Sequence, residues 1–380
     1  MINVFQPSLG DEELAAIGEV LSSNWLGHGK RTAAFEAEFA EHIGVEPEHV
    51  LFINSATAGL FLTTELLGLG PGDDVVLPSV SFVSAANAIA ATGARPVFCD
   101  VDERTLNPTA ADIEAALTPD TRAVFLLHYG GYPGQVQEIA QLCRDRGLLL
   151  VEDAACAVAS SADGQACGTF GDVAMWSFDA MKVLVTGDGG MLYVRDPELA
   201  RTARRLAYHG LERASGFSSA ARVSHRWWEL DVREFGRRVI GNDLTAAIGS
   251  VQLRRLPSFV AQRAEAARHY DSLLAEVPGL LRPPALPEGH TTSYYFYWVQ
   301  VEPAQRDALA KDLLDNGVYT TFRYPPLHRV PVYGWSGPDL PATDRAADRT
   351  LLLPIHQTIS RTDVEHVTSV LTDSLTSVAA

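Results

Sequence analysis

Apolar runs of strand length alternate with amphipathic segments along the first half of the chain. The runs predict β-strands at 50–53, 75–77, 96–98, 123–127, 148–151 and 173–178. Apolar residues at helical spacing predict helices at 11–22, 32–43, 58–67, 84–91, 110–116, 136–145 and 197–207. Strands that alternate with helices are typical of crossover units, so we expect an α/β fold with a mostly parallel central sheet.

The pattern changes in the second half. Residues 211–241 are rich in Ser, Arg and Trp and predict a long functional loop. A helix is expected over 244–270, with a kink or break at Pro257. Further strands are expected at 294–301 and 318–322, and further helices at 304–316 and 363–376. We therefore expect a large domain, 1–250, that includes the N-terminal segment, and a smaller α+β domain, 251–380.

Composition narrows the possible functions. A chain of 380 residues is long for a single core. Its net charge of −17 argues against nucleic acid or an anionic membrane as the main partner. The four cysteines show no C-x-x-C spacing, which favours reduced thiols in a cytoplasmic protein and argues against a metal site. We expect neither a leader peptide nor a membrane-spanning segment.

The segment from Trp176 to Val194 carries one lysine, Lys182, between two apolar strands. Burial disfavours the charged amine, so we expect a lowered pKa and a nucleophilic amine at neutral pH. Such an amine can form a Schiff base with an aldehyde cofactor. The alternative is a surface lysine in a glycine-containing hairpin loop.

The strand at 148–151 is followed by two acids, Glu152 and Asp153. In an open α/β sheet the carboxyl ends of strands face the ligand crevice. An aspartate there can keep a pyridine nitrogen protonated, which makes pyridoxal 5′-phosphate (PLP) an electron sink. Taken alone, Asp153 fits better as a helix N-cap. With Lys182 on a later strand, PLP binding becomes the better interpretation.

Three more segments contain residues that could bind the phosphate or the pyridine ring of PLP. Asn54 to Thr57 follow the first strand, where helix N–H groups and hydroxyls can bind an anion or form an ordinary cap. Phe82 could stack on a pyridine ring or belong to the core, and Ser177 could reach a phosphate or be an ordinary strand hydroxyl. Neither a G-x-G-x-x-G after the first strand nor a P-loop is present, which argues against dinucleotide enzymes and P-loop kinases.

Together the chain's motifs resemble those of the DegT–StrS family of PLP-dependent sugar aminotransferases, which have the aspartate aminotransferase (type I) fold. The resemblance covers nearly the whole chain. The matching segments are Asn54-Ser-Ala-Thr57, Gly72-Asp-Asp-Val-Val-Leu-Pro-Ser79, Glu152-Asp-Ala-Ala155, Ser177 to Lys182, Thr186 to Gly190 and Ala246 to Leu253.

The resemblance implies roles for individual residues. Lys182 is the Schiff-base residue, Asp153 the partner of the ring nitrogen and Phe82 the stacking ring. The phosphate is bound by Ala56, Thr57 and Ser177. The family forms homodimers with shared active sites, in which Arg238 of the second subunit reaches the phosphate, although many members have Asn or Lys there. Asn242 belongs to the same segment, but its role could be limited to capping the helix that follows.

The resemblance also implies the substrates, L-glutamate as amino donor and a nucleotide-linked ketosugar as acceptor, most often a dTDP-4-keto-6-deoxyhexose aminated at C4. Two segments look like sugar-site segments, one with Trp25 and one with Arg323, Tyr324 and His328. An arginine there can pair with a diphosphate. Both could equally be loops without ligand contact. His128 is expected to be structural.

Three departures from the family pattern remain. Cys156 stands where members often have Gln or His near the ring's 3′-oxygen, and Met181 replaces a frequent Thr or Pro. The segment 226–228 could contact a nucleotide or cover the subunit interface.

Other functions stay open: amination at C3, a keto-inositol acceptor, a PLP-dependent sugar dehydratase, or a noncatalytic sugar-binding relative. The presence of Lys182 argues against the last two.

Overall fold

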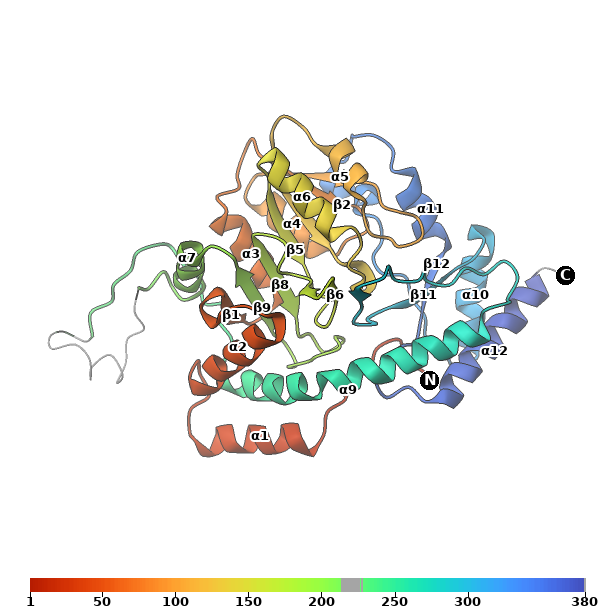
Figure 1. Ribbon diagram of the computed structural model, residues 1–380, viewed down its shortest axis with the longest axis horizontal. Coiled ribbons are helices and arrows are strands. Elements are labelled where there is room, and N and C mark those ends of the chain that lie inside the picture. Colours follow the sequence, from red (N-terminus) through yellow and green to blue (C-terminus); the bar gives the residue numbers. More distant parts are fainter. Residues whose placement is uncertain (213–225, 227, 379–380) are drawn as a thin grey trace.

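A seven-stranded sheet forms the centre of the larger part of the molecule (Figure 1). The computed structural model describes residues 1–212, 226 and 228–378. In sheet order the strands are β1 (Val50–Ile53), β9 (Gly190–Val194), β8 (Val173–Ser177), β5 (Leu149–Asp153), β4 (Thr121–Leu127), β2 (Asp74–Pro78) and β3 (Arg95–Cys99). Strand β9 runs antiparallel to β1 and β8, and the remaining pairs are parallel. The expected α/β fold with a mostly parallel sheet is confirmed.

Helices cover both faces of this sheet, which is why its strands are almost continuously apolar. One face packs against α3 (Ala56–Leu66), α4 (Val83–Ala91) and α7 (Pro197–Ala207). The other packs against α5 (Ala110–Ala116) and α6 (Val136–Arg146). The central strand β4 contributes to both cores, with Phe125 on one side and Val124 and Leu126 on the other.

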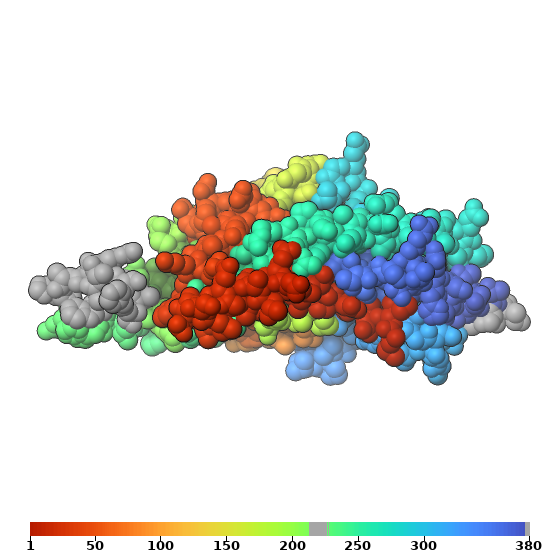
Figure 2. Space-filling model, turned by 90° about the horizontal axis from the view of Figure 1, so that it is seen from below, coloured from red at the N-terminus to blue at the C-terminus, as the bar shows by residue number. Residues whose placement is uncertain are grey.

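Helix α9 (Asp243–Leu273) runs along the lower side of the molecule in Figure 1 and links its two parts. Its first half packs against α1 (Asp11–Ser22) and α2 (Lys30–Ile43), and α12 (Arg361–Val378) packs on it further along. Seen from below, the red N-terminal residues lie directly against the teal α9 (Figure 2).

The smaller part of the molecule is built on a two-stranded antiparallel sheet, β11 (Tyr297–Gln300) with β12 (Thr350–Leu353). Its core is shared with α9, α10 (Pro303–Asp315) and α12, and α11 (Pro341–Arg349) lies against α10. The short strands are β6 (Ser161–Ala162), β7 (Gln165–Ala166) and β10 (His290–Thr291), and the 3-10 helices are η1 (Pro47–His49), η2 (Tyr129–Gly131), η3 (Leu327–Arg329) and η4 (Pro331–Tyr333).

Several expectations for the second half need correction. The expected break at Pro257 is wrong, because α9 is one continuous helix in which the neighbouring Leu256 and Phe259 are buried in the core. The alternative, a kink at Pro257, stays a prediction. Residues 318–322 form no strand and make only single bridges, at Val318 and Thr321. Local patterning did not predict α11 or β12. The expected division into domains 1–250 and 251–380 stays a prediction; its boundary lies within α9.

The segment 211–241 is irregular where the structure describes it, with single bridges such as Tyr208 to Arg238. Residues 213–225 and 227, which include nearly half of the expected loop and part of the Arg226–Trp228 segment, lie outside the described residues. Within the described ranges, no helix is long and apolar enough to cross a membrane.

A buried carboxylate ties α2 to α9 and provides a test of this packing. Asp243 Oδ1 accepts hydrogen bonds from the backbone N–H (2.9 Å) and the hydroxyl (2.7 Å) of Thr32. We expect Asp243→Ala to lower the free energy of unfolding by about 1–3 kcal/mol, because it leaves a buried donor unpaired. The exposed control Asp11→Ala should change it by less than about 0.5 kcal/mol. Equal effects in chemical denaturation would contradict this role.

Candidate active site

A cavity of about 540 Å³ opens at the carboxyl ends of β5 and β8. The larger part of the molecule contributes strand ends, helix starts and the loop after β8. The smaller part contributes Tyr295 and the segment 321–325. The principal lining residues are Ser55, Ala56, Thr57, Phe82, Ser84, Asp153, Ser177, Asp179, Met181, Lys182, Asp188, Tyr295, Arg323 and Tyr324. The cavity therefore brings together most of the residues singled out from the sequence.

Asp153 ends β5, and its carboxylate is buried, with 5% of the residue exposed. The N–H of Ala155 donates to Oδ1 at 3.1 Å. Burial raises the pKa of the Asp153 carboxyl above its usual value, while the Ala155 hydrogen bond and the positive charges of Lys182 and His128 act the other way. A cationic group bound in the cavity beside Asp153 would stabilise the ionised carboxylate. A protonated pyridine nitrogen meets this requirement.

The neighbouring Glu152 has a structural role instead. Successive strand residues point to opposite faces, so its carboxylate is directed away from that of Asp153. It accepts hydrogen bonds from the N–H groups of Gly168 (2.7 Å) and Gly171 (2.6 Å), and it pairs with His128 at 2.8 Å. The expectation that His128 is structural agrees with this contact, which anchors the strand end that carries Asp153.

Lys182 lies half-buried in the loop after β8. Its Nζ is 3.9 Å from Cys156 Sγ and 4.5 Å from the centroid of the Tyr295 ring. The expected lowering of the Lys182 pKa is wrong for the chain without a ligand. Burial alone would lower this pKa, but negative charge on Cys156 and Tyr295, once these groups ionise, and on Asp153 raises it above its usual value. In the chain without a ligand the surroundings therefore favour the protonated amine, and Lys182 must lose this proton before it can act as a nucleophile or a base.

Cys156 connects Lys182 to the opposite wall of the cavity. Its Sγ is also 3.9 Å from the hydroxyl of Tyr324. Burial raises the pKa of the Cys156 thiol, so it stays neutral at physiological pH. The side chain that replaces the family's usual Gln or His is thus a small, uncharged group in contact with the lysine.

The start of α3 forms one wall of the cavity. Ser55 caps the helix by accepting the N–H of Ala58 at 3.1 Å, and the Thr57 hydroxyl lies 2.9 Å from that of Ser84. Ala56 and Ser177 line the cavity beside them. Backbone N–H groups at a helix start, together with hydroxyls, form an anion site. Ser55 is therefore a helix cap, and because the helix start also faces the cavity, the anion site stays a prediction.

Phe82 belongs to the cavity and not to the core. It is the N-cap residue of α4 and is 46% exposed. Its ring is tilted by 55° against that of Tyr324, with centroids 5.4 Å apart. An accessible aromatic face in a cavity can receive a flat ring.

Three candidates do not line the cavity of their own chain. His328 Nδ1 lies 2.7 Å from the Ser79 hydroxyl and its Nε2 lies 3.2 Å from Asp344, and its expected contact with the sugar stays a prediction. Trp25 is 59% exposed, and its indole N–H donates to the His28 carbonyl at 3.1 Å; its expected contact with the sugar stays a prediction. Arg238 is considered below.

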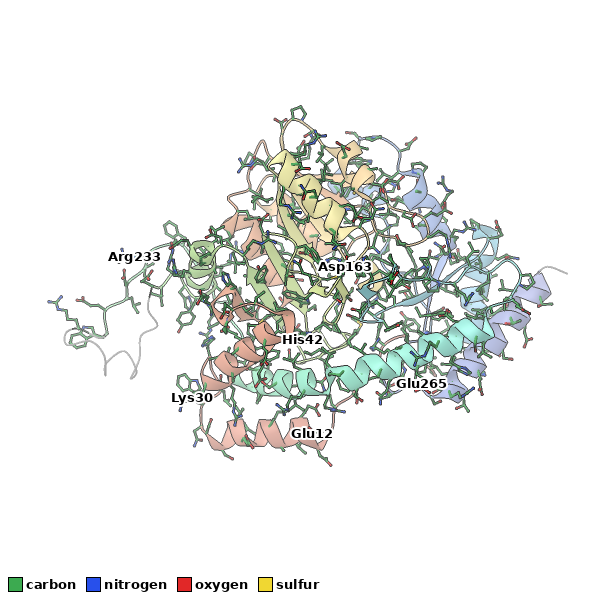
Figure 3. The ribbon with its side chains drawn as sticks, viewed as in Figure 1. Glu12, Lys30, His42, Asp163, Arg233 and Glu265 are labelled. Carbon is green, nitrogen blue, oxygen red and sulfur yellow. The ribbon has the colours of Figure 1, made fainter. Side chains whose placement is uncertain are left out.

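Arg238 is exposed, and its guanidinium lies 5.7 Å from the Tyr208 ring centroid. The segment around Arg233, labelled in Figure 3, lies beside α7. The residue after Arg238 is next to the turn that starts α3, since the Asn54 N–H donates to the Val239 carbonyl at 2.8 Å. Arg238 is not among the lining residues of the cavity in its own chain. Its expected role across a subunit interface stays a prediction.

Sequence reasoning missed Tyr295, Asp179 and Asp188. Tyr295 lies within a run of aromatic residues that predicts only a strand, and no local pattern distinguishes it from its neighbours. Its ring approaches Lys182 because the smaller part of the molecule packs over the cavity.

Gly190 allows the anion site to form, since a Cβ there would lie 2.7 Å from the Ala56 nitrogen and 2.8 Å from the Trp176 carbonyl oxygen. Both atoms belong to the backbone and cannot move aside cheaply. We expect Gly190→Ala to push α3 away from β9, to destabilise the protein by about 1–3 kcal/mol and to weaken PLP binding. In the control Gly18→Ala the Cβ meets open space within α1, so a gain of about 0.5–1 kcal/mol is expected. Unchanged unfolding and PLP titrations for Gly190→Ala would show that the close approach is unimportant.

Comparison with known proteins agrees with this geometry. A dTDP-4-dehydro-2,3,6-trideoxy-D-glucose 4-aminotransferase from Saccharopolyspora spinosa is 63% identical over 367 residues, covering 97% of this chain and 95% of that protein. The crystal structure of the aminotransferase TlmJ from Streptoalloteichus hindustanus matches with a TM-score of 0.95 and 60% identity over 100% of both chains. The sugar aminotransferase CalS13 from Micromonospora echinospora matches with a TM-score of 0.88 and 30% identity over 98% of this chain and 100% of that one.

These similarities confirm the type I PLP-dependent transferase fold expected from the sequence. Residues 7–372 match the DegT/DnrJ/EryC1/StrS aminotransferase family. The chain belongs to the DegT/DnrJ/EryC1/StrS family and is a PLP-dependent aminotransferase.

Proposed function

We propose that this enzyme transfers the amino group of L-glutamate to C4 of a nucleotide-linked 4-keto-6-deoxyhexose, with a dTDP-linked sugar as the first candidate. The observation that carries the proposal is the joint presence of the Lys182 amine, the buried Asp153 carboxylate and the helix start at Ala56 in one cavity. The relative from Saccharopolyspora spinosa acts on a dTDP-linked 4-ketosugar that lacks hydroxyls at C2 and C3. Its high identity supports a sugar of this class.

The cavity fits PLP by its chemistry. Ala56, Thr57 and Ser177 would hold the phosphate, Phe82 would support the ring, and Asp153 would face its nitrogen. When bound, PLP supplies an electron sink that stabilises negative charge on the carbon that loses a proton. A nearby cation would stabilise the ionised form of the buried Asp153 carboxylate, which supports this orientation of the ring nitrogen.

Lys182 would carry the proton. Its Nζ would accept a proton from the α-carbon of the amino donor and deliver one in the opposite half of the cycle. Cys156 and Tyr295 hold that nitrogen in place, at 3.9 Å and at 4.5 Å from the ring centroid. Tyr324 and Phe82 flank the cavity with aromatic surface and limit the access of water. The presence of Lys182 supports amino transfer over the alternative of a PLP-dependent sugar dehydratase.

Two further parts of the proposal concern the oligomeric state of the enzyme and its location in the cell. The exposed Arg238 supports a homodimer in which one subunit contributes an arginine to the phosphate bound by the other. The four cysteines, Cys99, Cys143, Cys156 and Cys167, are free and buried, which supports a reducing cytoplasm as its location.

The acceptor can be tested with the purified enzyme. Incubation with PLP, glutamate and dTDP-linked 4-ketosugars, with and without hydroxyls at C2 and C3, should yield products that mass spectrometry identifies as aminated. Labelled nitrogen from glutamate should appear in the sugar. Lys182→Ala should reduce turnover by several orders of magnitude, and borohydride should fix PLP on Lys182 of the unaltered protein. Loss of water without gain of nitrogen would instead establish a dehydratase, and an adduct on another lysine would overturn the assignment of Lys182.

Subunit sharing predicts complementation. A bound phosphate dianion is only partly neutralised by a helix start, and a charge-assisted contact from Arg238 would add about 1.5–3 kcal/mol. Lys182→Ala and Arg238→Ala should each be impaired as homodimers. A mixed dimer would contain one site with both residues intact, so activity should partly recover after the two variants exchange subunits. Confirmed exchange without recovery would show that Arg238 does not act across the interface.

A further inference from the structure

A second cavity, of about 430 Å³, lies between α9 and the start of α12. Among the residues that the structure describes, none lines both this cavity and the active-site cavity. Glu265, labelled in Figure 3, marks the stretch of α9 that forms one wall, and residues 357–364 form the other. A cavity of this volume can hold a small ligand, and we call it the α9–α12 cavity.

A buried guanidinium lies behind one wall of this cavity. Arg263 of α9 is fully buried, and no carboxylate pairs with it in the described part of the chain. Its guanidinium donates to the carbonyls of Tyr294 and Ile355 and to Gln357 Oε1, each at 3.1 Å, while its Nη2 has no hydrogen-bond partner. Burial lowers the pKa of Arg263 to about 10, so the group is still charged at neutral pH. Buried charges in proteins are usually paired, and this one lacks a counter-ion.

Gln357 lines the cavity and is buried, with 4% of the residue exposed. Its Oε1 accepts from Arg263, which has no acceptor of its own, so this contact fixes which end of the amide faces the guanidinium. The Nε2 end therefore points away from Arg263, and this buried donor has no partner among the described residues. An unpaired buried donor is costly, and an acceptor in the cavity would remove that cost.

The charged residues around the cavity leave positive charge in excess. Arg361 and His269 each lie 3.3 Å from the carboxylate of Glu365. Arg268 and Glu265 are exposed lining residues that form no ion pair with another described residue, and their charges offset each other. The charge of the buried guanidinium is therefore not balanced by the side chains around it.

The start of α12 adds backbone donors to this wall. The Ser360 hydroxyl donates to Asp363 Oδ2 at 2.6 Å and accepts from the Asp363 N–H at 3.0 Å, which caps the helix. The N–H groups of Arg361 and Thr362 have no acceptor within the helix, because they belong to its first turn. The helix dipole also favours negative charge at this end.

We propose that the α9–α12 cavity binds a small organic anion through a carboxylate or phosphate group. Gln357 Nε2 and the Arg268 guanidinium donate to its oxygens, and Arg263 and the start of α12 contribute positive potential. Three separate features favour the same class of ligand: an unneutralised buried guanidinium, an unpaired buried amide and a helix start. The site lies outside the active-site cavity, so the proposal does not depend on the proposed function.

Calorimetric titration of the PLP-saturated protein with inorganic phosphate and, separately, with succinate tests this site. Saturating PLP keeps phosphate out of the active-site cavity. One or both anions should bind at one site per chain, and the anion that binds identifies the recognised group as phosphate or carboxylate. Arg268→Gln should weaken this binding roughly tenfold, the loss expected for one charge-assisted contact. The control Arg254→Gln removes an exposed arginine of α9 outside the cavity and should leave binding unchanged.

Gln357→Glu provides a sharper test. It keeps the shape of the side chain and its contact with Arg263, but it replaces the unpaired amine by a carboxylate oxygen. It should abolish anion binding and raise the unfolding temperature of the anion-free protein, because the buried guanidinium gains a counter-ion. Added anion should raise the unfolding temperature of the unaltered protein and of Arg254→Gln more than that of Gln357→Glu. This comparison cancels the general stabilising effect of phosphate on folded proteins.

Several outcomes would overturn the proposal. One is the absence of saturable binding for both anions. Another is binding that persists in Gln357→Glu and is lost in Arg323→Gln, because the anion would then occupy the active-site cavity. Equal thermal stabilisation of all variants would show a nonspecific salt effect and would contradict the site. If Gln357→Glu fails to fold, the comparison of Arg268→Gln with Arg254→Gln decides.

Discussion

The parallel pairing of β5 with β8 is the constraint on which the site depends. Its register aligns Val151 with Val173 and Asp153 with Met175, so both strands end at the same edge of the sheet. That edge carries Asp153 directly and Ser177 two residues beyond the last paired position. Loss of this register by one residue would turn the Asp153 carboxylate to the opposite face, where Glu152 now makes its structural hydrogen bonds.

Close backbone packing turns this edge into a binding site. Gly190 pairs with Ser177 on one side and with Ile53 on the other, and this brings the start of α3 against β9. The hydroxyls and N–H groups at the helix start therefore face the same cavity as Asp153 and Lys182. The anion site and the site for the reacting amine are held together by one antiparallel strand in an otherwise parallel sheet.

The cavity also depends on residues far away in the chain. Lys182 is supported by Tyr295, Tyr295 by Phe5, and Phe5 also supports Arg323. The side chains around Lys182 favour its protonated amine in the chain without a ligand, opposite to the effect of burial alone. The electrostatic character of the site therefore arises where the two parts of the molecule and the N-terminal segment meet.

The sequence by itself determined the parts that depend on local pattern. Apolar runs and helical spacing predicted most elements of the first half, since each is fixed by its own burial on one or two faces. Combinations of neighbouring residues, such as Glu152-Asp153 and the turn at Ser55, indicated the family and most residues of the cavity. These signals are local, so no tertiary information was needed to recognise them.

The tertiary structure alone decided the features that depend on residues distant in sequence. Helix α9 continues through Pro257 because packing on both sides of the proline outweighs a local preference. Tyr295 enters the site, and His328 turns to Ser79 and Asp344, through contacts that no spacing encodes. The pKa of Lys182 was predicted in the wrong direction because it depends on Cys156, Tyr295 and Asp153. These residues are distant from Lys182 in sequence, and Tyr295 belongs to the smaller part of the molecule. Such energies follow from which side chains meet in space, and only the folded chain determines that.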